Sequence, residues 1–201
     1  ALLETWGFNY HAMSMPVPEG AVGVPGPNGT YSDRAVNMNN FAAEVQALTD
    51  PPVKMLWIAA RNPVSQDPDT NDIIKMFNSM ELVVTVDSFF NKTVELSDIV
   101  LPATTHFEDW DVMASYWHYW VGINQRAIEP MYEAKSDVEI AMALSKAMNA
   151  LEPGSCTYPT EGDPEEWVAK EFNDGIHSML GISGYKDLLD GPRKAKISPV
   201  A

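Results

Sequence analysis

Short apolar runs that alternate with helical patterns are the feature that most constrains the fold of this chain. Apolar residues recur at helical spacing over residues 35–48 and 69–80, and a short helix or turn is expected over 91–96. Three apolar runs are too short for helices and are expected to be strands: 55–60, 82–86 and 98–101. Strands that alternate with helices form parallel sheets covered by those helices. The sequence therefore predicts an α/β fold in three layers, α/β/α, with a mostly parallel sheet.

The ends of the chain differ from its middle. Residues 1–34 contain prolines, among them Pro16 and Pro25, that exclude a long helix or an inner strand, so we expect an extended arm. Residues 35–190 are expected to form one α/β domain, and residues 191–201 a linker toward a further part of a longer protein.

The second half of the expected domain is less regular than the first. Residues 104–130 are aromatic and show no clear period. Three further helices are expected: 137–148, 164–180 and 185–189. Asp163 should cap the second of these, because it directly precedes Pro164.

Charge and composition exclude several classes of function. The formal net charge of -15 makes attraction to nucleic acid unfavourable, so we expect no nucleic-acid partner. Cys156 is the only cysteine, so this sequence alone cannot form a disulfide or a multi-cysteine zinc or iron–sulfur site. No apolar run approaches the roughly 20 residues that span a bilayer. The four histidines are scattered, and no catalytic triad or phosphate-loop motif occurs. We expect no catalytic residues and no metal ligands here.

The candidates for a ligand site are the residues that follow each predicted strand, because open parallel sheets bind ligands beyond the carboxyl ends of their strands. They are Arg61 to Gln66 after the first strand, Asp87 to Phe89 after the second, and Pro102, Thr104 and Thr105 after the third. Ser65, Asp67 or Asp69 could cap the next helix, whose amino end would then offer amides to a pyrophosphate.

Several acidic residues have both a ligand-binding and an ordinary interpretation. The two oxygens of Asp87 match the pair of N–H donors on guanine, but a strand-end aspartate also accepts hydrogen bonds from the amides of its own turn. Asp137 could contact a ligand or simply stabilise the first turn of a helix. Glu108, Asp109 and Asp111 could be paired carboxylates for acid–base work or part of a solvated face.

Taken together, five stretches closely resemble the third domain of the dimethyl-sulfoxide-reductase-type molybdopterin oxidoreductases. The resemblance covers about residues 35–190. The stretches are VKMLWIAARNP at 53–63, the following PD at 68–69, VVTVD at 83–87 with the later Thr93, SDIVLPATT at 97–105 with Glu108, and IEPMYEAKSD at 128–137.

The resemblance implies a Rossmann-like domain that holds the guanosine end of one of two molybdopterin guanine dinucleotides, whose metal is molybdenum or tungsten. It implies that the residues approaching this cofactor are Asn62, Gln66, Val86, Asp87 and Asp137. The chain would be an internal part of a larger oxidoreductase and inactive alone. Its partners would be the remaining domains of that subunit, with any iron–sulfur cluster in those other parts. An iron–sulfur subunit and a membrane anchor are further partners that the family commonly has.

The chain departs from the family pattern at two positions. Ala60 and Arg61 stand where a glycine pair often precedes the loop asparagine. Asp109 stands where a basic residue often follows the glutamate, so the cofactor's phosphates need a cation from elsewhere. Asp109 and the aromatic segment at 116–120 support an alternative, a scaffold or subunit-docking module without cofactor contact. Substrate, metal and localisation stay open.

Overall fold

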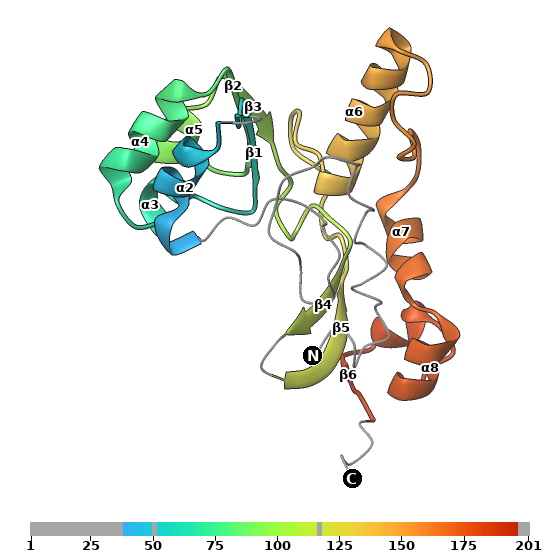
Figure 1. Ribbon diagram of the computed structural model, residues 1–201. Helices are drawn as coiled ribbons and strands as arrows, with labels where there is room; N and C mark the ends of the chain where they lie inside the picture. The colour runs from blue at the N-terminus through green and yellow to red at the C-terminus, as the bar shows by residue number, and fades with distance from the viewer. Residues whose placement is uncertain (1–37, 50–51, 116–117, 197–201) are drawn as a thin grey trace. The chain divides into compact units, whose positions relative to one another are not determined.

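The computed structural model describes residues 38–49, 52–115 and 118–196 (Figure 1). The described residues form two compact units that meet in the sequence between Leu101 and Pro102. Each unit is described by itself. The sequence predicts one domain over residues 35–190, and these bounds stay a prediction. The predicted arm at residues 1–34 lies outside the described residues.

The first unit is a parallel α/β unit (Figure 1). Its elements in chain order are η2 (Met38–Asn40), α2 (Phe41–Ala47), β1 (Met55–Ala59), α3 (Pro63–Gln66), α4 (Thr70–Ser79), β2 (Leu82–Asp87), α5 (Lys92–Glu95) and β3 (Ile99–Pro102). The sheet order is β1-β2-β3, and β1 pairs in parallel with β2 from Met55 opposite Leu82 to Ala59 opposite Val86. The predicted α/β fold with a parallel sheet is confirmed.

The core of the first unit lies between the sheet and helices α2, α3 and α4, which Figure 1 shows beside β1. Ile73 and Met76 of α4 are completely buried, against Ile58 of β1 and Val83 of β2. Side chains alternate between the two faces of a strand. Leu56 and Ile58 therefore face this core, whereas Met55 and Trp57 of the same strand are exposed.

The helix boundaries of the first unit follow from local hydrogen bonds. The side chain of Asp69 caps α4 by accepting the backbone N–H of Asp72 at 3.2 Å, so Asp69 is the cap among the three candidates. Asn91 caps α5 in the same way. The one-turn helix α3 was not predicted, because four residues are too few to show a helical period.

The second unit contains an antiparallel sheet and a set of helices (Figure 1). Its elements are β4 (Asp111–Ser115), β5 (His118–Asn124), α6 (Asp137–Leu151), α7 (Pro164–Glu171), α8 (Asp174–Leu180), η3 (Tyr185–Leu188) and β6 (Arg193–Lys194). Strand β5 lies between β4 and β6 and is antiparallel to both. A core of buried side chains joins β5 to the last helices: Val121, Val168, Phe172, Ile176, Leu180 and Leu188.

Two features of the second unit differ from the sequence prediction. Residues 104–130, expected to be irregular, contain the β4–β5 hairpin, whose exposed aromatic residues hide the alternation of a half-buried strand. The helix expected over 164–180 is broken, because the Asn173 side chain accepts the N–H of Ile176 and starts α8 anew. The cap at Asp163 is confirmed. Among the described residues, no helix has both the length and the apolar content to cross a bilayer.

Candidate functional site

Asn62 and Gln66 lie in the turn that follows β1 and bond to each other. The backbone N–H of Asn62 donates to Gln66 Oε1 at 2.9 Å. Asn62 Oδ1 accepts the hydroxyl of Thr93 at 2.5 Å, and that hydroxyl accepts the N–H of Val64 at 3.2 Å. Thr93 is completely buried, and its hydrogen bond to Asn62 holds the side-chain amide of Asn62 in one orientation. Two of the predicted site residues are thus held in one turn.

Asp87 ends β2 and is half-buried. Its Oδ1 accepts the N–H of Phe89 at 2.9 Å, and its Oδ2 accepts Asn91 Nδ2 at 2.6 Å. This is the ordinary turn interaction that the sequence allowed. A carboxylate oxygen has two lone pairs, so each oxygen can still accept a second hydrogen bond. The aspartate therefore has a fixed orientation and a remaining capacity for a ligand.

A chain of hydrogen bonds joins the ends of β1 and β2. Asn91 donates to Asp87 and accepts the N–H groups of Thr93 and Val94 through its Oδ1, at 3.0 and 3.1 Å. Thr93 then reaches Asn62. Asp87 and Asn62, 25 positions apart in the sequence, are therefore linked through two side chains of one short loop and helix. Val86, which precedes Asp87, is buried (3% exposed) and pairs with Ala59.

The loop after β1 has an unusual backbone and an ion pair. Ala60 has φ of 54°, in the left-handed region that glycine adopts without strain. The loop thus keeps a backbone suited to glycine although the residue is alanine. The next residue, Arg61, forms an ion pair with Asp67, and its guanidinium lies 5.8 Å from the centre of the Phe41 ring.

Asp137 belongs to the second unit, where it is the first residue of α6 and exposed. The cap of α6 is Ser136, whose hydroxyl accepts the N–H of Glu139 at 3.2 Å while the Glu139 carboxylate accepts the N–H of Ser136 at 2.9 Å. Asp137 is therefore not used as a cap. A pocket of about 330 Å³ adjoins it and is lined by Ala103, Thr104, Thr105, His106, Asp109, Asp111, Met113, Asn124 and Asp137.

Glu108 forms hydrogen bonds to Thr105, which lines this pocket, and to Met131. It is 5% exposed, and its Oε2 accepts both the N–H of Thr105 at 2.8 Å and its hydroxyl at 2.7 Å. Its Oε1 accepts the N–H of Met131 at 2.8 Å. These bonds, first that of the Thr105 N–H, lower the pKa of the Glu108 carboxyl. A carboxylate with this many hydrogen bonds has a structural role and is a poor acid–base group. Glu108 is therefore not a candidate for the acid–base carboxylates that the sequence left open.

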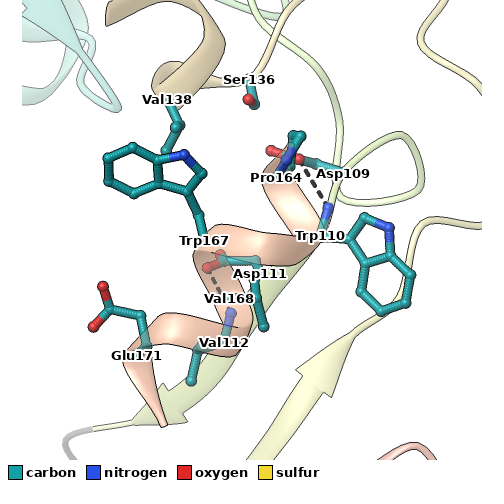
Figure 2. A pocket seen from close by; sticks show the side chains of 10 residues that line it. All are labelled: Asp109, Trp110, Asp111, Val112, Ser136, Val138, Pro164, Trp167, Val168 and Glu171. Carbon is teal, nitrogen blue, oxygen red and sulfur yellow. Dashed lines mark hydrogen bonds between the residues drawn. The ribbon is translucent and has the colours of Figure 1, made fainter. Parts of the chain in front are cut away.

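A second pocket of about 320 Å³ lies between β4 and α7 (Figure 2). Figure 2 shows Asp109 and Asp111 each accepting the N–H of the following residue, at 2.8 and 2.7 Å, while Trp167 and Glu171 approach from α7. Burial raises the pKa of the Asp109 carboxyl and the nearby Glu139 raises it further, against the hydrogen bond from Trp110 N–H. A site with this charge disfavours phosphate, as expected from the acidic residue at position 109.

The structure thus brings Asn62, Gln66, Val86 and Asp87 to one edge of the first unit's sheet, and it places Asp137 beside Thr104 and Thr105 in the second unit. Sequence reasoning gave no site role to Asn91 and Thr93. An asparagine two residues before a threonine at a helix start was the available signal, since both side chains often bond to a helix's first amides. Within the described part of the chain, no three histidine, cysteine or acidic residues are placed to hold a metal ion.

Comparisons with known proteins identify the family of this chain. The family model "Molybdopterin oxidoreductase" matches residues 9–147. "Probable oxidoreductase YyaE" of Bacillus subtilis is 36% identical over 123 residues, 61% of this chain and 18% of that protein. Trimethylamine-N-oxide reductase 1 of Escherichia coli K12 is 31% identical over 151 residues, 74% of this chain and 17% of that protein.

A solved structure supports the fold. Acetylene hydratase from Pelobacter acetylenicus superposes with a TM-score of 0.59 and 21% sequence identity, over 80% of this chain and 21% of that enzyme. The chain therefore spans about a fifth of the proteins that it matches. Because the family model covers residues 9–147, well over half of the sequence, the chain belongs to the molybdopterin oxidoreductase family.

Proposed function

We propose that this chain holds the guanosine end of a molybdopterin guanine dinucleotide within a larger molybdenum or tungsten oxidoreductase, and that it is not catalytic alone. The observation that carries this proposal is the hydrogen-bonded chain from Asp87 through Asn91 and Thr93 to Asn62. It fixes two polar side chains at the carboxyl edge of a parallel sheet, which is where such sheets bind nucleotides.

The residues present fit the nucleotide end of this cofactor. Asp87 is acceptor-only and already oriented by Phe89 and Asn91, so its remaining lone pairs suit the two adjacent N–H donors of guanine. Adenine lacks that pair of donors, so the aspartate would select guanine. Asn62, Gln66 and Val86 would contact the cofactor beside Asp87, and we propose Asp137 as a further residue that contacts it. The metal of the bound cofactor would supply the oxidation–reduction chemistry.

The rest of the enzyme is also part of the proposal. The relatives are nearly six times as long as the matched region, which supports further domains in the same subunit. We propose those domains as the direct partners of this chain, with an iron–sulfur subunit and a membrane anchor as partners of the assembled enzyme.

The test compares the full-length protein that carries this chain with its Asp87→Ala variant. Protein-bound guanine, released by acid hydrolysis, and the metal content per protein are measured for both. The variant should lose most of its guanine and metal, while Asp72→Ala, which removes an exposed carboxylate on α4, should keep them. Equal guanine and metal in Asp87→Ala and the unchanged protein would reject the proposal.

A second candidate function is subunit docking without cofactor contact. It is favoured by an apolar groove of about 480 Å³ along the β4–β5 hairpin, where Met113, Trp120 and Leu189 are 59%, 47% and 42% exposed. If the Asp87→Ala protein keeps its cofactor but Trp120→Ala elutes as a smaller assembly in size-exclusion chromatography, docking replaces cofactor binding as the function of this chain.

A further inference from the structure

Cations are scarce at the edge of the first unit's sheet where the nucleotide is proposed to bind. The described residues of this unit include four basic side chains: Lys54, Arg61, Lys75 and Lys92. Lys54 precedes β1 and so lies at the opposite edge, paired with Glu81. Lys75 lies within α4 and pairs with Asp72 at 2.6 Å. A nucleotide's phosphate groups need positive charge or amide donors, and the candidates within this unit are the remaining two basic residues and the helix ends.

The helix ends of this unit do not meet that need. Helices α3 and α5 have four residues each, too few for an appreciable dipole. The ten-residue helix α4 begins with Asp69 as its cap and Asp72 in its first turn. The Asp69 side chain already occupies the Asp72 amide, and two carboxylates repel an anion at this end. The sequence-based expectation that this helix receives a pyrophosphate is therefore not favoured by its charge.

Arg61 is the cation that the fold holds in place beside the predicted site residues. It directly precedes Asn62, and its guanidinium is fixed between Asp67 and the ring of Phe41, 5.8 Å away. The Arg61 side chain is 35% exposed, whereas that of Asp67 is 7% exposed. The cation therefore reaches solvent while its counter-ion does not. Lys92, by contrast, is 69% exposed and paired with the exposed Glu95.

The pairing with Asp67 gives Arg61 a fixed orientation before any ligand binds. An ordered guanidinium loses less conformational entropy on binding than a mobile lysine, and its planar fork matches two phosphate oxygens. Asp67 balances the charge of Arg61 at long range, so the attraction acts at short range, where the guanidinium is more exposed to a ligand than the carboxylate is.

We propose that Arg61 binds the phosphate groups of the guanine nucleotide whose base is held by Asp87. This inference rests on the proposed function and adds the residue that recognises the phosphates. Arg61 stands where the family often has a glycine, and Asp109 stands where the family often has a basic residue. Arg61 would therefore supply, in the loop after β1, the positive charge that position 109 lacks. Base recognition and phosphate recognition then belong to different residues and can be separated by experiment.

The experiment uses the full-length protein produced without its cofactor and isothermal titration with guanosine, GMP and GDP at low salt. The unchanged protein should bind GDP more tightly than guanosine. In Arg61→Met the ratio of GDP affinity to guanosine affinity should fall about tenfold or more, the usual effect of losing one charge-assisted hydrogen bond. The affinity for guanosine should stay unchanged. Lys54→Met, which removes a cation from the opposite edge of the same sheet, should behave as the unchanged protein.

Two further variants keep the outcome decisive. Arg61→Gln keeps a hydrogen-bond donor for Asp67 but has no charge, so it should also lose the higher affinity for GDP than for guanosine. This variant provides the test if Arg61→Met does not fold. Asp87→Asn should lose the preference for GDP over ADP but keep the dependence on phosphate. If GDP binds no better than guanosine, or if Arg61→Gln keeps the full preference for GDP over guanosine, the role of Arg61 is refuted while the function proposed for Asp87 stands. If neither guanosine nor GDP binds, both are refuted.

Discussion

Replacing Thr93 with valine is the most direct way to break the link between the two strand ends. Valine has nearly the shape of threonine but lacks the hydroxyl, which accepts the N–H of Val64 and donates to Asn62. Val64 is 3% exposed, so its amide would be left buried without a partner. An unsatisfied buried donor costs about 1–3 kcal/mol, and the lost bond to Asn62 about 1 kcal/mol more.

The expected loss is therefore roughly 2–4 kcal/mol of local stability, which corresponds to a roughly 30- to 800-fold increase in opening of the loops. Hydrogen–deuterium exchange followed by mass spectrometry should show faster exchange in peptides covering residues 60–68 and 88–97. Thr93→Ser keeps the hydroxyl and loses only a methyl group, so it should exchange much closer to the unchanged protein. If Thr93→Val exchanges at the unchanged rate, or if Thr93→Ser is as fast, the hydroxyl does not hold these loops.

Three more substitutions test other parts of the structure. Ala60→Gly should stabilise the first unit by about 0.5–1 kcal/mol, because relief of the left-handed backbone exceeds the entropy cost of glycine, and slower exchange over residues 55–66 would measure it; faster exchange would contradict the assigned φ. Gly162→Ala should destabilise the second unit by roughly 1–3 kcal/mol, since the new methyl would lie 2.6 Å from Trp167 Nε1 and φ is 159°; an unchanged melting temperature would contradict this. Asp109→Asn should change the pH dependence of stability. Because the pKa of Asp109 is raised in the folded state, the unfolded state releases this proton at a lower pH. The free energy of unfolding should therefore fall as pH rises from about 4 through the folded pKa. Urea unfolding across pH 3–7 should show a smaller fall in Asp109→Asn.

The first unit was largely predictable from the sequence because its signals are local. Each strand is a short apolar run, and the helix cap at Asp69 is of a residue type that favours caps. The α/β class, the parallel sheet and the family are confirmed. The sequence also predicted that Asn62 and Asp87 lie near the ends of β1 and β2, because this requires only that the ends of the two strands are recognised.

What could not be predicted depends on contacts between distant residues. The role of Thr93 requires the approach of Val64, 29 positions away, and Glu108 requires Met131, 23 positions away. The β4–β5 hairpin was hidden because exposed aromatic residues such as Tyr119 and Trp120 remove the polar positions that mark a strand's outer face. The contacts of Asn62, Gln66, Val86, Asp87 and Asp137 with a cofactor stay predictions.

The hydrogen-bonded chain from Asp87 to Asn62 also has an evolutionary consequence. The hydroxyl at position 93 donates to the amide at position 62, and the amide at position 91 donates to the carboxylate at position 87. A single replacement at any of these positions leaves its partner without one of its hydrogen bonds, so substitutions should be accepted in pairs. Positions 62 and 93, and positions 87 and 91, should therefore covary among homologous sequences.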